Sequence, residues 1–201
     1  MVLQNDLIEF LTSFLDEGAI LQGKDVSGRT AGGLHTEESI QAKVIVRPKT
    51  TQELSKIISA CHQSNQSIVV HGGLTGLVYG TRSTQDQLVI SLERMNQIED
   101  VDLIGRTITC QSGTTLQTIQ ELAEENNMMF PLDLGARGSC SIGGNIATNA
   151  GGNRVIRYGM MRDSVLGLEA VLADGTVLTS MNTMIKNNAG YDLKQLFIGT
   201  E

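Results

Sequence analysis

The sequence lacks the features that define several classes of protein. It carries 15 basic against 22 acidic side chains, a formal net charge of −7, so it has no excess of positive charge for the phosphates of a nucleic acid. Its three cysteines are an odd number without a C-x-x-C pair, and its three histidines lie far apart in the chain. These patterns argue against a disulfide framework and against a zinc site. We predict neither a nucleic-acid partner nor a bound metal.

A long apolar run is missing as well. The first twenty residues contain Asp6, Glu9, Asp16 and Glu17 and no basic segment. A signal peptide begins with basic residues, and a membrane-spanning helix needs about 20 apolar ones. The sequence therefore predicts no membrane span and, by default, a cytoplasmic location. Its 201 residues, 40% hydrophobic and 18% charged, are typical of a folded protein with one large domain or two small subdomains.

Glycine, in contrast, is abundant and unevenly distributed. Half of the 22 glycines lie in two short windows, Gly72 to Gly80 and Gly135 to Gly159. Glycine permits positive φ and the close approach of a ligand. The first window can direct backbone N–H groups at phosphate oxygens, although its spacing is not the G-x-G-x-x-G of a Rossmann turn. The second, rich in Ser, Thr and Asn, is either a binding segment for an extended polar ligand or an ordinary loop.

The apolar pattern between residues 42 and 71 predicts a β-α-β unit. Strands are expected over residues 42–47 and 67–71. Between them, Thr50 to Glu53 form a capping box, and the apolar residues that follow have helical spacing. The first glycine window comes directly after the second strand, where a ligand-binding loop is expected.

Further elements flank this unit. We expect a helix that Asp6 caps and Gly18 ends, strands over 88–92 and 107–110, a helix capped by Thr114, and a hairpin that turns at Asp174-Gly175. Together they predict an α+β fold with an N-terminal helix and lead-in loop (1–41) and two α/β subdomains (42–105 and 106–201).

Six ordered motifs make the chain resemble one family. The motifs are Ile68-Val-Val-His-Gly-Gly-Leu-Thr-Gly-Leu77, Leu132-Asp-Leu-Gly-Ala-Arg-Gly-Ser139, Ile142-Gly-Gly-Asn-Ile-Ala-Thr-Asn-Ala-Gly-Gly152, Arg157-Tyr-Gly159, Gly167-Leu-Glu-Ala-Val-Leu-Ala-Asp-Gly175 and Asn188-Ala-Gly-Tyr-Asp-Leu-Lys-Gln-Leu-Phe-Ile-Gly-Thr-Glu201. With them the chain is similar to the FAD-linked oxidases of the vanillyl-alcohol oxidase superfamily, and within it to D-2-hydroxyglutarate dehydrogenase, D-lactate dehydrogenase and the FAD subunit of glycolate oxidase. The resemblance runs from about Ala42 to the last residue.

The resemblance implies a PCMH-type FAD-binding domain, made of the two subdomains. The first glycine window would hold the pyrophosphate of FAD, and the second would line the rest of the cofactor. Thr75 stands where covalently flavinylated members carry His, which implies non-covalent FAD. The residues implied to bind the cofactor are His71, Gly72, Gly73, Leu74, Thr75, Gly76, Leu77, Gly80, Thr81, Pro131, Ser139, Ile142, Gly143, Gly144, Asn145, Thr148, Asn149, Gly151 and Tyr158.

The implied chemistry is oxidation of a D-2-hydroxy acid to the 2-oxo acid by hydride transfer to flavin N5, with the electrons passed on to a carrier or quinone. The family places its base and carboxylate-binding residues in a C-terminal substrate domain. We expect that domain to be absent here and the second subdomain to be incomplete, because the last motif normally continues beyond Glu201. The chain alone would then be inactive, and we assign no catalytic residue: Asp133 and Glu169 are lone carboxylates. We also expect a homodimer.

Two departures from the family pattern leave alternatives open. Leu74 stands where relatives usually carry Gly or Asn, and His71 stands where Arg, Gln or Gly is commoner. A bulky Leu74 in the pyrophosphate turn either weakens binding or rearranges it. The alternatives to a flavoenzyme domain are a flavin-free, non-enzymatic protein that kept the fold, and a half that needs a partner chain.

Overall fold

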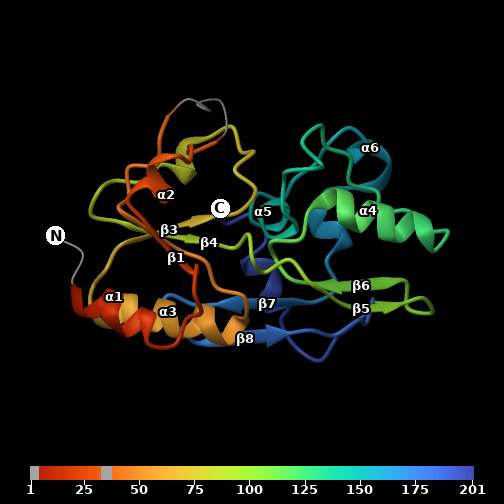
Figure 1. Cartoon of the computed structure of the whole chain (residues 1–201). Coiled ribbons are helices and arrows are strands. Elements are labelled where there is room, and N and C mark those ends of the chain that lie inside the picture. The colour runs from red at the N-terminus through yellow and green to blue at the C-terminus, as the bar shows by residue number, and fades with distance from the viewer. Residues whose placement is uncertain (1–4, 33–37) are drawn as a thin grey trace. The chain divides into compact units, whose positions relative to one another are not determined.

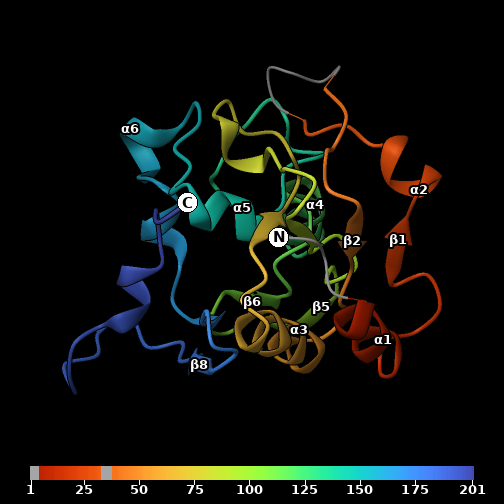
Figure 2. The ribbon, with the colours of Figure 1, turned by 90° about the vertical axis from the view of Figure 1, so that its left-hand side faces the viewer.

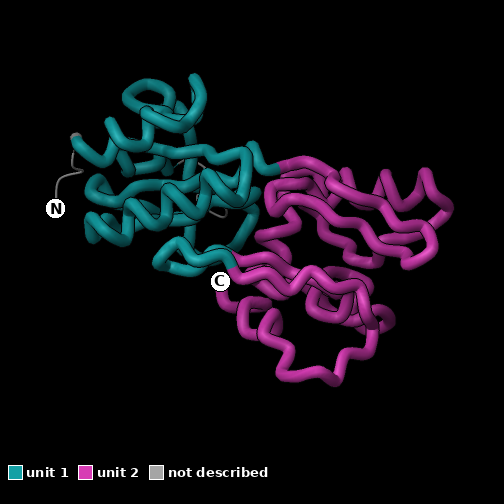
Figure 3. The backbone as a smooth tube through the Cα atoms, turned by 90° about the horizontal axis from the view of Figure 1, so that it is seen from below, with its two compact units in different colours: residues 1–95, 171–177 teal, residues 96–170, 178–201 magenta. Residues whose placement is uncertain are grey.

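A computed structural model describes residues 5–32 and 38–201. Of Asn5 it describes only the backbone. The described chain forms two compact units (Figure 3). Unit 1 consists of residues 1–95 and 171–177, and unit 2 of residues 96–170 and 178–201. The subdomain boundaries expected after residues 41 and 105 stay a prediction. His35, one of the three histidines considered for a metal site, lies outside the described residues.

Unit 1 contains a four-stranded sheet in the order β1-β2-β4-β3 (Figure 1). Strands β2 and β3 both run parallel to β4, and β1 runs antiparallel to β2. The elements are α1 (Asn5–Thr12), β1 (Ile20–Gln22), α2 (Lys24–Ser27), β2 (Val44–Val46), α3 (Thr51–Gln63), β3 (Ile68–His71), η2 (Tyr79–Thr81) and β4 (Leu88–Ser91). The β-α-β unit expected over 42–71 is therefore present.

The central strands of this sheet are buried on both faces. Val44, Val46 and the β4 residues that share their face pack against α1 and α3, which lie side by side below the sheet (Figure 2). Ile45 and Val89 point the other way and join a second cluster with Val26 of α2. The sequences of strands that are covered on both faces are continuous apolar runs and do not alternate. VIV and LVIS are accordingly buried throughout and, apart from Ser91, apolar.

Side-chain caps begin helix α3, as predicted. The Glu53 N–H donates to Thr50 Oγ1 at 3.1 Å. The Glu53 carboxylate, however, accepts from the Lys49 N–H at 2.7 Å, one residue further back than in a standard capping box. In α1 the expected cap is displaced, because Asn5 is already helical and Asp6 lies in the first turn. That helix ends at Thr12, well before Gly18.

Unit 2 contains two antiparallel strand pairs and several short helices. Its elements, some of whose end residues belong to unit 1, are β5 (Ile98–Asp102), β6 (Thr107–Cys110), α4 (Leu116–Glu125), α5 (Ile142–Ala147), α6 (Val155–Tyr158), η3 (Met161–Ser164), β7 (Leu168–Val171), β8 (Val177–Ser180) and η4 (Leu193–Leu196). Strand β5 was not predicted. Helix α4 begins one residue later than expected: Thr115 Oγ1 accepts from the Thr118 N–H at 3.2 Å, whereas Thr114 is only 1% exposed and does not cap.

The β7–β8 hairpin turns at the predicted Asp174-Gly175. Gly175 has a φ of +91°, and its turn packs on α3, since a Cβ there would lie 2.7 Å from the Ser55 carbonyl oxygen. The Ser55 hydroxyl donates to the Gly175 carbonyl at 2.6 Å. The resulting mixture of helices and sheets confirms the α+β class. Within the described ranges, no helix combines the length and apolarity that crossing a membrane needs, and no three potential ligand side chains gather as they would around a metal.

Candidate cofactor-binding site

The backbone amides of residues 72–78 are available to a ligand. We call these residues the glycine loop; it follows β3 directly and precedes η2. No main-chain or side-chain acceptor in the described part of the chain takes a hydrogen bond from its N–H groups. A Cβ added at Gly76 or Gly80 would meet no atom within 4 Å, so the space beside the loop is open. An anion site needs backbone N–H groups that no protein acceptor holds, and this loop has them.

Leu74 adopts the left-handed conformation in the middle of this loop, with a φ of +56°. Such a conformation costs a non-glycine residue about 1–2 kcal/mol and is found where a ligand is held. Gly32 makes it fit: a Cβ there would lie 2.3 Å from the Leu74 carbonyl oxygen. The chain therefore accommodates Leu74 in a left-handed conformation with a small residue opposite it.

The His71 side chain is buried beneath the loop at 2% exposure. Its Nε2 lies 2.8 Å from the Thr81 carbonyl oxygen, and because a carbonyl only accepts, Nε2 carries the proton. Burial lowers the pKa of His71, and the neighbouring Arg29 acts in the same direction, while the Thr81 carbonyl and Glu93 oppose it. The imidazole is therefore neutral at physiological pH.

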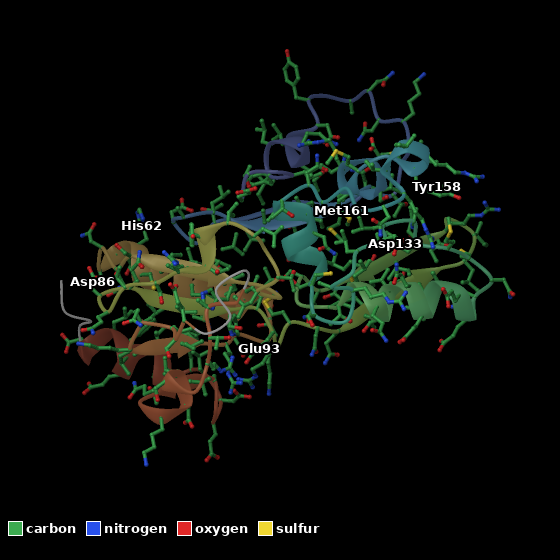
Figure 4. The ribbon with its side chains drawn as sticks, turned by 90° about the horizontal axis from the view of Figure 1, so that it is seen from above. His62, Asp86, Glu93, Asp133, Tyr158 and Met161 are labelled. Atoms are coloured by element: carbon green, nitrogen blue, oxygen red, sulfur yellow. The ribbon has the colours of Figure 1, made fainter. Side chains whose placement is uncertain are left out.

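An ion-pair cluster lies at the same end of the sheet. Glu93, labelled in Figure 4, accepts from Arg29 in two hydrogen bonds of 2.8 and 2.9 Å and from Arg47 at 2.8 Å. The Arg29 guanidinium, with Arg47, lowers the pKa of Glu93 to about 2 against the effect of its partial burial. The Arg29 carbonyl also accepts a hydrogen bond from the Ile40 N–H. Through Arg29 the cluster therefore joins the lead-in segment to Glu93, which follows β4.

Two of the predicted residues of unit 1, Leu77 and Thr81, line a small depression. Thr81 donates through Oγ1 to the Ala31 carbonyl at 2.8 Å. Leu77 is 71% exposed, and the Arg82 guanidinium lies 3.8 Å from the centre of the Tyr79 ring. The depression is lined by Ala31, Gly32, Glu38, Leu77, Val78, Tyr79, Thr81 and Arg82.

In unit 2, the residues 139–152 form what we call the α5 segment. Ser141 caps α5, its Oγ accepting from the Gly144 N–H at 3.3 Å. The Gly143 N–H donates to the Ser112 carbonyl at 2.7 Å, and a Cβ on Gly143 would lie 2.7 Å from the Ser112 Cβ. Gly143 therefore allows α5 to pack closely against Ser112 within unit 2. Ile142, at 7% exposure, belongs to the core of the unit.

Asn145 supplies an unpaired polar group in this segment. It is 4% exposed, and its Nδ2 has no hydrogen-bond partner among the described residues. Burial raises the pKa of the nearby Cys140 thiol and Asn145 opposes this, but sulfur is a weak acceptor and no hydrogen bond of normal geometry forms. A buried amide without a partner costs about 1–3 kcal/mol, which an acceptor on a ligand would remove.

Asn149 and Arg162 join the α5 segment to the last described residues. Asn149 has a φ of +47°, and its Oδ1 accepts from the Arg162 N–H at 2.9 Å. The Arg162 guanidinium donates to the Gln195 carbonyl at 3.0 Å and to the carbonyl of Ile198. The Gly199 N–H donates to the Ile146 carbonyl of α5 at 3.0 Å. Sequence reasoning did not identify Arg162, because only long-range contacts reveal its part.

The other predicted residues of unit 2 differ in exposure. Thr148 donates through Oγ1 to the Gly144 carbonyl at 2.9 Å. Tyr158, labelled in Figure 4, is half-buried, with the Arg157 guanidinium 5.1 Å from its ring centre. Pro131 and Gly151 are half-buried, and Ser139 is exposed.

The two carboxylates considered for acid–base chemistry have structural partners. Asp133 lies 3.6 Å from Arg154, and Glu169 accepts from the Thr179 hydroxyl at 2.8 Å. Neither contact indicates a catalytic group.

Comparison with known families identifies the family to which residues 42–180 belong. Residues 42–180 match the model of a family described as FAD binding domain. The chain belongs to this family. The glycine loop and the α5 segment both lie inside the matched region. The resemblance inferred from the six motifs is confirmed.

Individual relatives agree with this membership. The chain is 50% identical over 160 residues to a D-2-hydroxyglutarate dehydrogenase of Bos taurus, covering 80% of this chain and 29% of that protein. It is 40% identical over 161 residues to a D-2-hydroxyglutarate–pyruvate transhydrogenase of Saccharomyces cerevisiae, covering 80% and 32%. The chain thus spans about a third of the length of these relatives.

A solved structure confirms the fold. Alkyldihydroxyacetonephosphate synthase superposes with a TM-score of 0.85 over 98% of this chain and 38% of that one, at 20% identity.

The expected cytoplasmic location is wrong. The relatives from cow, rice and zebrafish are named as mitochondrial enzymes. The expectation was a default drawn from a missing signal, and a missing signal does not specify a compartment.

Proposed function

We propose that this chain binds FAD non-covalently, with the pyrophosphate at the glycine loop. The observation that carries the proposal is the family match over residues 42–180, because the loop with free N–H groups lies within it. The left-handed Leu74 and the unpaired Asn145 amide support it, since both have energetic costs that a bound ligand would offset. The residues present thus fit a dinucleotide with anionic and polar parts. No histidine or cysteine lies in the glycine loop to form a covalent link.

We further propose that the flavoenzyme built on this domain oxidises a D-2-hydroxy acid to the 2-oxo acid. Bound FAD would accept the hydride of the substrate Cα–H at N5, while a base takes the hydroxyl proton. The names of the cow and yeast relatives, which specify D-2-hydroxyglutarate, support this substrate class. The two carboxylates considered for acid–base chemistry, Asp133 and Glu169, have structural partners, and we propose that the base lies outside this chain and that the chain alone is inactive.

Other parts of the proposal rest on similarity alone. The names of the relatives support a mitochondrial location. Transfer of the electrons to a carrier or quinone, and a homodimer, stay predictions.

An absorption spectrum of the purified chain tests the cofactor proposal. We expect flavin bands near 370 and 450 nm at about one FAD per chain, either as purified or after FAD is added. Acid precipitation should release the flavin into the supernatant, because the binding is non-covalent. A folded chain that stays colourless at high FAD would contradict the proposal and favour a flavin-free protein that kept the fold. Flavin that stays with the pellet would contradict non-covalent binding.

A further inference from the structure

We infer that His71 is a positioning residue whose buried imidazole holds the two ends of the glycine loop together without touching the ligand. The inference rests on the proposed function only where it names FAD as that ligand. It assigns the His71 side chain a different part from the cofactor contact that the family resemblance implies.

The position of the ring supports this role. His71 is the last residue of β3, and its backbone is held by the parallel ladder to Ser91 and by the Leu92 N–H, which donates to the His71 carbonyl at 3.0 Å. The ring lies inside unit 1, with 2% of the residue exposed. A fixed backbone and a buried ring give the Nε2 proton a defined direction, toward the Thr81 carbonyl at 2.8 Å.

This hydrogen bond joins residues on either side of the loop. His71 precedes the glycine loop and Thr81 ends η2, so the hydrogen bond holds together the two ends of the segment that contains the loop. Within the loop no described acceptor holds the N–H groups, so the loop conformation depends on how its ends are fixed. Ordering one residue costs about 1–2 kcal/mol, and closing the ends in advance removes part of that cost from ligand binding.

Further contacts hold the same end of the loop. Thr81 also donates through Oγ1 to the Ala31 carbonyl, and the Ala31 N–H donates to the Glu38 carbonyl at 2.9 Å. Arg29 of this segment is paired with Glu93, close to the imidazole. These contacts fix the Thr81 side of the loop to the lead-in segment, while the His71 side chain links it to β3.

The protonation state agrees with this role. A neutral imidazole with its proton on Nε2 satisfies the Thr81 carbonyl and introduces no buried charge beside Arg29. The tautomer is therefore set by the acceptor that the loop presents.

Hydrogen–deuterium exchange of the full chain without FAD tests the inference. In His71→Leu the volume is nearly kept and the donor is lost, so the Arg82 amide, whose N–H donates to the Tyr79 carbonyl of η2, should exchange about three- to tenfold faster, the value of one hydrogen bond. His71→Gln places an amide N–H near the position of Nε2 and should restore slow exchange. Peptides from α3 serve as the internal control and should not change in either variant.

Two results would overturn the inference: unchanged exchange of the Arg82 amide in a folded His71→Leu chain, or exchange of that amide in His71→Gln as fast as in His71→Leu. If His71→Leu does not fold, the ¹⁵N signals of the His71 ring in the unaltered protein test the inference, because they show which ring nitrogen carries the proton. A neutral ring protonated on Nε2 at pH 6.5 is expected, and a ring protonated on Nδ1 would refute the tether. Because these measurements need no FAD, they can succeed even if the cofactor proposal fails.

FAD affinity provides the link to function. If the chain binds FAD, His71→Leu should raise the Kd about three- to tenfold and His71→Gln should restore it. An equal Kd in His71→Leu and the unaltered chain would show that the tether does not position the ligand site.

Discussion

In the glycine loop of unit 1, no described acceptor takes the main-chain N–H groups, and the space beside Gly76 is open. In the α5 segment of unit 2, the Gly143 N–H donates to the Ser112 carbonyl, and a Cβ on Gly143 would collide with the Ser112 side chain. Both regions are rich in glycine, yet glycine provides free donors in one and close packing in the other. A glycine-rich sequence therefore does not by itself specify a binding loop; the partners of its N–H groups do.

Replacing single glycines by alanine should separate the two regions most clearly. Gly143→Ala puts a Cβ 2.7 Å from the Ser112 Cβ and 2.9 Å from the Ser112 oxygen. We expect it to lower the free energy of unfolding by about 2–3 kcal/mol, as overpacking does. Gly76→Ala, with no atom within 4 Å of the new Cβ, should change it by less than about 0.5 kcal/mol. Urea unfolding followed by circular dichroism measures both, and equal losses would remove the distinction.

Substitution of Leu74 tests the strain in the glycine loop. At a φ of +56°, Leu74→Val adds a β-branched side chain that tolerates the left-handed conformation poorly, whereas Leu74→Gly removes the strain. The valine variant should be less stable than the glycine variant by about 1–2 kcal/mol in the same urea experiment. A valine variant as stable as the glycine variant would show that the loop is not strained at this residue.

Acid should weaken unit 1 through Glu93. Its pKa is lowered to about 2 in the folded chain, mainly by the hydrogen bonds from Arg29. A carboxyl whose folded pKa is depressed stabilises the fold fully above its unfolded pKa of about 4.3, and this stabilisation is lost as pH falls toward 2. Because the pair is partly exposed, screening should limit the loss to about 1 kcal/mol or less. Glu93→Gln should show a smaller drop in urea midpoint between pH 5 and pH 3 than the unaltered chain; an equal drop would exclude Glu93 as its source.

Much of the fold could be predicted because its signals are local. The capping residue Thr50, the apolar face of α3 and the turn at Asp174-Gly175 each lie within a few residues of the structure they specify. Strand β5 was missed because its sequence, IEDVD, contains three acidic residues and no fully buried one. The sequence predicted Thr114 as the cap of α4 where the structure has Thr115. The two adjacent threonines cannot be told apart by residue type, and only the burial of Thr114 distinguishes them.

The site was predictable as a set of segments and not as a set of contacts. The six motifs identified the family and with it the two windows. That Gly32 makes room for Leu74, that His71 bonds to Thr81, and that Arg162 reaches Gln195 and Ile198 all depend on residues distant in sequence. Whether the predicted residues contact FAD stays a prediction.

The central claim, that the free N–H groups of the glycine loop bind the FAD pyrophosphate, is tested most directly by two variants of equal charge. Gly76→Asp and Gly190→Asp each add one carboxylate at a site where a Cβ meets no atom within 4 Å, the first in the loop and the second outside the predicted site. Titration with FAD should show at least a tenfold weaker Kd for Gly76→Asp, from repulsion between the carboxylate and the phosphates, and an unchanged Kd for Gly190→Asp. Equal affinity of the two variants would place the pyrophosphate elsewhere and contradict the account.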